Sequence, residues 1–307
     1  FMLTYSHFFS KPIRGLNSSS YRQIDHEGKG ISGIHRSRQV LSDEVSGYLF
    51  VRNQVPNSGV FVAREAFLRA GGYNENLKYA EGWDLFLRLA PLGGFAYIDL
   101  PLVLIRRHQL NLSRNVNNML ESGKSILSRY SISQITQAVK RRRLPPEVNQ
   151  ADLVSILYRL DKWNEGFLIS QEIVDAYPEY AEGYFLSGLF WLKCKDWPNA
   201  EKAFRQTLAL EAEHEAATNN LVALLAMRGS VMEARRLLTG LLQYKPGYLD
   251  AGHNLALINQ GGRLDAGVLK FTWRKLRPEL MRYWDDQAMK GSGEHPGSIL
   301  NLGKAGK

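Results

Sequence analysis

The C-terminal half of the chain repeats one arrangement of small and bulky residues at intervals of 34 positions. The clearest unit has its marked positions at Tyr184, Ser187, Gly188, Trp191, Ala200, Phe204 and Ala212. Adding 34 leads to Thr218, Leu221, Val222, Leu225, Ala234, Leu238 and Pro246, and subtracting 34 leads to Leu153, Val154, Leu157, Gly166 and Pro178. A weaker fourth unit runs through Leu255 and Ala256 to Phe271 if one residue near Gly261 is treated as deleted. A repeat of this kind predicts a stack of helical hairpins, because one hairpin alone cannot bury its apolar face.

This spacing resembles the tetratricopeptide repeat (TPR), a helix-turn-helix unit of roughly 34 residues. Small residues at positions 166, 188, 200 and 234 allow the helices to approach closely, and the bulky residues fill the grooves between them. Pro178 and Pro246 fall where helices are expected to end. The resemblance implies a protein or peptide partner on the solenoid, and an ordinary helical bundle with accidental periodicity is the alternative.

The chain carries a net charge of +9, from 39 basic and 30 acidic residues. The one dense basic run is Lys140–Arg143, which precedes Pro145 and Pro146. We interpret this run as a solvated linker or helix end, and contact with phosphates or an anionic membrane surface is the alternative. Charge alone supports a nucleic-acid partner, and we predict none.

The remaining composition is that of a folded protein, with 44% hydrophobic and 22% charged residues. Because no apolar run reaches the length of a membrane span, we predict no transmembrane segment. The single cysteine, Cys194, excludes an internal disulfide and a multi-cysteine metal site, and we expect it to be a small buried hydrophobe. We predict a cytoplasmic protein or one peripheral to the inner face of a membrane.

Before the two prolines, short β-rich stretches alternate with short helical patterns. The expected strands are Tyr48–Arg52, Gly59–Ala63, Phe95–Ile98 and Leu102–Ile105, and the expected helices are Arg64–Ala70 and Gly82–Ala90. This alternation predicts an α/β layer, and residues 116–143 are expected to form a helical connector.

The stretch that carries candidate chemistry begins near Asn57 and includes a short acidic helix. Glu81 stands at the N-terminal edge of this helix, where the helix dipole favours a carboxylate. Asp84 and Arg88 stand four residues apart and therefore share one face. A carboxylate at such a position is a candidate general base that deprotonates a hydroxyl group.

The same stretch resembles the acceptor-side, C-terminal half of family 2 glycosyltransferases, which have the GT-A fold. The matching residues are Val60 to Arg64, Gly71-Gly72-Tyr73, Glu81, Trp83-Asp84-Leu85, Arg88-Leu89-Ala90, Arg107-His108, Asn111 and Ser113. The resemblance implies transfer of a hexosyl-type sugar from a nucleotide-sugar donor to a hydroxyl of a glycan or protein acceptor.

The resemblance also implies roles for individual residues. Glu81 is the first candidate for the catalytic base and Asp84 the second, although Asp84 is also expected to pair structurally with Arg88. The substrate-binding candidates are Asn57, Ser58, Arg88 and Arg107, and the tentative metal ligand is His108. The structural alternatives are turn formation for Asn57 and Ser58, solvation for Arg107 and an ordinary hydrogen bond for His108.

Two departures from the family pattern affect this interpretation. The second residue of the family's acidic pair is Gly82 here, which cannot accept a proton. The D-x-D motif that holds a divalent ion, Mg or Mn, on the donor diphosphate is absent, and Asp25-His26-Glu27 is expected to be a turn. Residues 1–56 resemble the stretch that follows that motif, with a strand near Met2 to Tyr5, so we expect a donor half upstream of Phe1 and an inactive chain without it.

The predicted fold is therefore a partial GT-A, Rossmann-like α/β half-domain followed by an all-α TPR-type solenoid. The expected segments are 1–115 (transferase portion), 116–146 (helical linker), 147–281 (three to four repeats) and 282–307 (flexible tail). The predicted function is glycosyl transfer, and the alternative is a non-catalytic interaction module that binds peptides and carries a vestigial transferase segment. The catalytic interpretation requires Glu81 or Asp84 to face a pocket.

Overall fold

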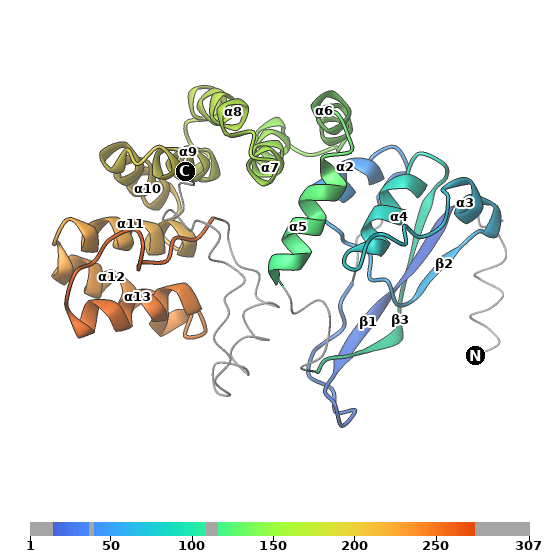
Figure 1. Cartoon of the computed structure of the whole chain (residues 1–307), viewed down its shortest axis with the longest axis horizontal. Helices are drawn as coiled ribbons and strands as arrows, with labels where there is room; N and C mark the ends of the chain where they lie inside the picture. The colour runs from blue at the N-terminus through green and yellow to red at the C-terminus, as the bar shows by residue number, and fades with distance from the viewer. Residues whose placement is uncertain (1–14, 37–39, 109–115, 274–307) are drawn as a thin grey trace. The chain divides into compact units, whose positions relative to one another are not determined.

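The computed structural model describes residues 15–36, 40–108 and 116–273, which divide into two compact units (Figure 1). The first unit ends at Asp161 and the second begins at Lys162. Helix α7 (Pro146–Arg159), which we expected to open the first repeat, thus lies in the first unit, where it packs on other helices of that unit. The predicted strand at Met2–Tyr5, the matches at Asn111 and Ser113 and the predicted tail lie outside the described residues.

The first unit contains a three-stranded mixed sheet in the order β2-β1-β3. The central strand β1 (Leu16–Ile24) runs antiparallel to β2 (Val60–Val62) and parallel to β3 (Phe95–Arg106). The predicted strand at 59–63 is confirmed by β2, and the two predicted strands at 95–98 and 102–105 are parts of the single strand β3. The central strand was not predicted because its sequence, LNSSSYRQI, places serines at buried positions where apolar residues are the usual signal.

Six helices accompany the sheet in the described part of this unit: α2 (Val45–Val51), α3 (Arg64–Arg69), α4 (Glu81–Leu89), α5 (Val116–Leu127), α6 (Ile132–Lys140) and α7. Helices α3 and α4 confirm the two predicted helices. The predicted strand at 48–52 is wrong: Val45 and Leu49 are buried one helical turn apart, and this tertiary burial outweighs the β propensity of the local sequence. The predicted connector is helical but breaks at Ser131, which forms a capping box with Gln134.

The basic run after α6 is part of the packed structure. The Arg142 side chain is 2% exposed, and it binds the Asn149 Oδ1 atom at 2.9 Å and the Asp152 carboxylate at 2.8 Å. Arg143 donates its backbone N–H to the Glu44 carboxylate at 3.0 Å. The run lies at the end of α6, as interpreted, but it is not solvated throughout, because Arg142 is buried. Two of its four charges, on Arg142 and Arg143, are paired with neighbouring carboxylates.

In the second unit, each helix packs on the next helix in the chain. Its helices are α8 (Trp163–Ala176), α9 (Ala181–Lys193), α10 (Trp197–Leu210), α11 (Glu215–Met227), α12 (Val231–Tyr244) and α13 (Leu249–Gln260). The starts at 163, 197 and 231 and those at 181, 215 and 249 each advance by 34. The left-handed residues Asp161, Lys195 and Gly229 have the same spacing. The predicted repeat is thus confirmed for these helices, which form an all-α, TPR-like stack.

The small residues of the repeat serve the close helix contacts that we expected. A Cβ atom at Gly188 would lie 2.6 Å from the Phe204 ring, and Ala200, Phe204 and Leu238 are fully buried. Trp191 packs edge-on against Phe167 with ring centroids 4.9 Å apart, which confirms its packing role. Cys194 is exposed at the end of α9, so its predicted burial is wrong.

The fourth unit departs from the prediction after its first helix. Gly261 and Gly262 have positive φ values of 73° and 103°, and the chain leaves the helical path there. Residues 263–273 form no second helix, and Phe271, which we placed on one, is 1% exposed within an irregular segment. In the described parts of the chain, no helix is both long and apolar enough to cross a membrane.

Candidate functional site

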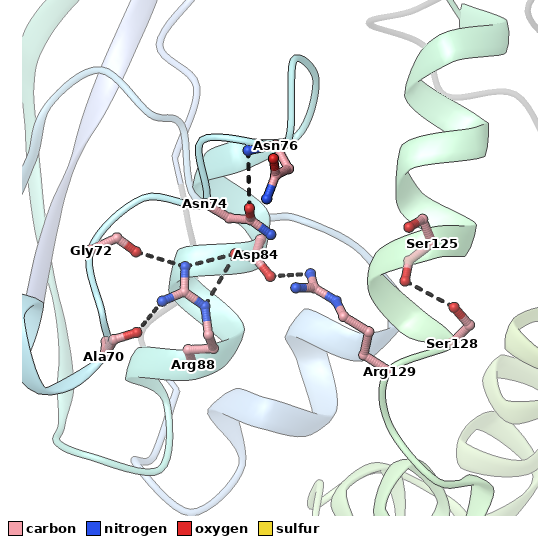
Figure 2. Close-up of polar contacts among 9 residues, drawn as sticks. All are labelled: Ala70, Gly72, Asn74, Asn76, Asp84, Arg88, Ser125, Ser128 and Arg129. Carbon is pink, nitrogen blue, oxygen red and sulfur yellow. Dashed lines mark hydrogen bonds and ion pairs between the residues drawn. The ribbon is translucent and has the colours of Figure 1, made fainter.

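The carboxylate of Asp84 lies at the centre of an ion-pair cluster in the first unit (Figure 2). Its side chain is 0% exposed, and one oxygen accepts from Arg88 Nη2 at 2.7 Å while the other accepts from Arg129. Both oxygens are therefore occupied by guanidinium groups and hidden from solvent. This arrangement corresponds to the structural pairing that we weighed for Asp84 and leaves no free oxygen for an acceptor hydroxyl.

The Arg88 guanidinium is directed at the backbone of the paired-glycine turn (Figure 2). It donates to the carbonyl oxygen of Gly72 at 2.8 Å and also to that of Ala70. Gly71 and Gly72 have φ values of 79° and 66°, a conformation that L side chains rarely adopt. Arg88, a candidate substrate-binding residue, thus ties the turn to α4.

Glu81 has a different environment at the start of α4. Its Oε1 atom accepts a hydrogen bond from Asn57 Nδ2 at 2.8 Å, and the side chain is half-buried. A Cβ atom at Gly82 would lie 1.9 Å from Asn57 Oδ1. Glycine at position 82 therefore provides the room in which the Asn57 amide reaches the Glu81 carboxylate. Asn57 and Glu81, both predicted site residues, are brought together.

The other predicted site residues are not part of this pair. Ser58 is exposed in the turn before β2, and His108 is exposed at the end of a described stretch. The Arg107 backbone N–H donates to the Ile24 carbonyl at 2.7 Å, which continues the pairing of β3 with β1. No group of three His, Cys, Asp or Glu side chains suited to a metal ion occurs within the described ranges. The Asp25–Lys29 stretch is a turn, as predicted.

A second candidate site lies in the C-terminal unit, where the segment Val268–Trp273 runs back along α11 and α13 (Figure 1). We call the surface of these helices that carries Asn219, Asn220 and Asn254 the inner face. Asn254 accepts from the Lys270 backbone N–H at 2.8 Å and donates to the Lys270 carbonyl at 2.8 Å. Asn220 accepts from the Thr272 backbone N–H at 2.6 Å and donates to the Thr272 carbonyl at 2.7 Å.

These two asparagines occupy equivalent positions of consecutive repeats, since 220 plus 34 is 254. Each amide side chain pairs with both backbone polar groups of one residue, and the two residues so bound, Lys270 and Thr272, are two apart. In an extended chain, alternate residues present their N–H and C=O groups to the same side. The inner face thus matches the backbone of an extended peptide.

The bound segment also buries side chains. Leu269, Phe271 and Thr272 are at most 2% exposed. The Thr272 hydroxyl accepts from Tyr248 Oη at 2.9 Å and from Asn219 Nδ2 at 3.1 Å, and it donates to Asp250 Oδ2 at 2.9 Å. Burial raises the pKa of Tyr248 well above its ordinary value, so its hydroxyl keeps its proton and remains a donor.

Sequence reasoning missed the inner face. The available signal was Asn220 followed 34 residues later by Asn254, a polar match at the same position of consecutive repeats. We compared only small and bulky positions, because these determine helix packing. The deletion assumed near Gly261 also placed Phe271 on a helix and hid its place in the bound segment.

Comparisons with known proteins add three similar solved structures. No protein-family model and no curated protein sequence matches the chain. "MamA 41-end" from Desulfovibrio magneticus RS-1 is 13% identical, with a TM-score of 0.37, over 48% of this chain and 85% of that one. YrrB, described as a TPR protein with an unusual peptide-binding site, is 16% identical, with a TM-score of 0.34, over 49% and 72%.

A third similar structure is a putative kinesin light chain with TPR-like repeats from Podosopora anserina, which is 16% identical, with a TM-score of 0.35, over 48% of this chain and 82% of that one. These scores lie below 0.5, so the class of the C-terminal unit rests on its own 34-residue helix spacing. That class is a TPR-like helical stack.

Proposed function

We propose that the C-terminal unit is a protein-interaction module that binds an extended peptide on its inner face. The observation that carries this proposal is the double pairing of Asn220 and Asn254 with the backbone of alternate residues. Backbone hydrogen bonds supply affinity without depending on side chains, and apolar pockets beside them supply selectivity. The inner face supplies the backbone hydrogen bonds, and Leu269 and Phe271 of the bound segment, which alternate with Lys270 and Thr272, are buried.

The proposal can be tested with eight-residue peptides selected from an unbiased display library on the full-length chain carrying Phe271→Ala/Thr272→Ala, which removes the buried side chains of the bound segment. Their affinities are then measured by fluorescence anisotropy after Asn220→Ala, Asn254→Ala or Asn259→Ala has been added to this chain. Each inner-face asparagine contributes two backbone hydrogen bonds, worth about 1 kcal/mol each, so its removal weakens binding about ten- to thirty-fold. Asn259 is exposed on the same helix as Asn254 and is the matched control.

The control variant is expected to bind as strongly as the chain that carries Phe271→Ala/Thr272→Ala alone. Selected peptides that bind all three variants equally would place recognition elsewhere and refute the module on the inner face. The proposal would also be refuted if no library peptide bound the chain even after substitution had removed the bound segment from the inner face.

Glycosyl transfer is the second candidate function, and the pairing of Asn57 with Glu81 favours it. We propose that Glu81, the half-buried carboxylate of this pair, is the base that activates an acceptor hydroxyl of a glycan or protein. A nucleotide-sugar donor and a divalent ion, Mg or Mn, are needed for the reaction. The D-x-D motif for that ion is not among the 307 residues, so the proposal concerns a protein that also supplies a donor-binding half.

The test of this second function is sugar transfer from labelled donors by a protein that contains both halves. We expect Glu81→Gln to lower kcat at least about 100-fold with little change in donor binding, because a general base contributes 10²- to 10⁴-fold. Glu75→Gln, an exposed carboxylate in the preceding turn, is the control. Unchanged turnover in Glu81→Gln would exclude Glu81 from this role.

A further inference from the structure

We infer that the segment Leu269–Thr272 covers the chain's own peptide-binding face and that a partner binds by displacing it. The partner peptide then carries the same sequence pattern as the segment: an aliphatic residue, any residue, an aromatic residue and threonine. This inference rests on the proposed peptide-binding function. It adds the regulation of the inner face and the class of partner sequence that the face accepts.

The segment fills the inner face as a bound peptide would. The groups that would meet a partner's backbone, on Asn220 and Asn254, are already bonded to Thr272 and Lys270. Phe271 is 1% exposed and Leu269 is 2% exposed, so the apolar side chains of the segment are buried as well. A partner peptide therefore cannot reach these groups while the segment is in place.

The connection to the last helix permits the segment to leave. Gly261 and Gly262 separate it from α13, both have positive φ values, and a Cβ atom at either would meet nothing within 4 Å. The next residue, Arg263, has a side chain that is 90% exposed. Since the contacts to Lys270 involve its backbone groups, another extended chain can form the same hydrogen bonds in exchange.

The inner face is expected to be most selective at the position of Thr272, where it accepts threonine. The Thr272 hydroxyl, at 0% exposure, bonds Tyr248, Asn219 and Asp250. Valine has a similar shape but removes the hydroxyl from all three contacts, which is costly in a buried site. A phosphothreonine would place its charge beside the Asp250 carboxylate, so it is expected to be rejected.

The tether between the segment and α13 determines how strongly the segment weakens the binding of a free peptide. A short flexible connection gives the segment an effective concentration of the order of 1 mM at the inner face. A free peptide that binds the open face with a Kd of about 10 μM then binds the closed chain roughly 100-fold more weakly, because it competes with its own tethered copy. The closed chain thus accepts only partners that bind well or that are themselves present at high local concentration.

The test uses a fluorescent peptide with the sequence of residues 266–273, AGVLKFTW, added to the full-length chain. Its Kd is compared between the unsubstituted chain and the opened variant Phe271→Ala/Thr272→Ala. Lys270→Pro is a second opened variant, which removes the N–H bound by Asn254 and leaves the buried side chains unchanged. Circular dichroism checks that the helices persist in both variants.

We expect the opened variants to bind the peptide at least ten-fold more tightly than the unsubstituted chain. Adding Asn254→Ala to an opened variant should abolish this gain, whereas adding Asn259→Ala should leave it. Hydrogen exchange should show protection of the Lys270 and Thr272 amides in the unsubstituted chain, and loss of that protection at saturating peptide. The peptides with valine or phosphothreonine at the last-but-one position should bind at least ten-fold more weakly.

Three other outcomes would count against this inference, and they differ in what they mean for the proposed function. Equal, Asn254-dependent affinity for the closed and opened chains would refute self-closure and leave the peptide-binding function standing. Absence of Asn254-dependent binding in both would show the segment to be a fixed part of the fold and would refute both. A bound peptide that leaves the Lys270 amide protected would also overturn self-closure.

Discussion

The substitution Asn254→Ala tests how much of the inner face is held by side-chain amides. Asn254 is 0% exposed and makes three hydrogen bonds, two with the backbone of Lys270 at 2.8 Å and one to Asn219 Oδ1 at 3.0 Å. A net contribution of about 1 kcal/mol for each bond gives a destabilisation of about 3 kcal/mol. The polar groups left behind on Lys270 and Asn219 keep the value from being smaller.

The assay is native-state hydrogen exchange followed by mass spectrometry, which reports each compact unit separately. A loss of about 3 kcal/mol lowers protection of the Lys270 amide roughly 100-fold, since each 1.4 kcal/mol is a factor of ten. Protection in the sheet of the first unit should not change.

Asn259→Ala is the matched control for this experiment, because Asn259 is exposed on the same helix and loses the same side chain. An exposed substitution of this kind changes stability by at most about 0.5 kcal/mol. If the destabilisation by Asn254→Ala and that by Asn259→Ala differed by less than about 0.5 kcal/mol, the amide contacts would not hold the segment on the inner face.

Three further substitutions test the remaining packing. Asp84→Asn removes the charge held by two guanidinium groups, and we expect a loss of roughly 3 kcal/mol in urea denaturation of the first unit, with a loss below 1 kcal/mol contradicting the structural role. Gly82→Ala should be nearly neutral, because a helix gain of about 1 kcal/mol offsets the displaced Asn57 bond, and in an Asn57→Ala background it should stabilise. Gly188→Ala should cost about 1 kcal/mol, since crowding of the Phe204 ring outweighs the helix gain, and a rise in melting temperature would oppose this account.

The repeat was the part of the fold that sequence reasoning predicted best. Gly188 and Ala200 recur as small residues, and Phe204 and Leu238 as bulky ones, because each hairpin makes the same contact with its neighbour. Such contacts are local and repeated, so they leave a periodic signal. The helix starts at 181, 215 and 249 follow that signal to the residue.

The α/β unit was predicted less completely because its decisive contacts are not local. Helix α4 was expected from its own sequence, but the strand at 48–52 proved to be the helix α2, which packs on α4 and α6. The buried serines of β1 carried no apolar pattern. The Asp84–Arg88 pair was foreseen from its four-residue spacing, whereas its second cation, Arg129, lies 45 residues away.

Both candidate sites depend on contacts between residues that are distant in the sequence. Asn57 reaches Glu81 across 24 residues, and Asn220 reaches Thr272 across 52. In each case glycine makes the contact possible: Gly82 leaves room for the Asn57 amide, and the pair Gly261–Gly262 ends the repeat and returns the chain to its own helices. The same glycines that weakened the sequence prediction therefore mark the places where the structure is specific to this chain.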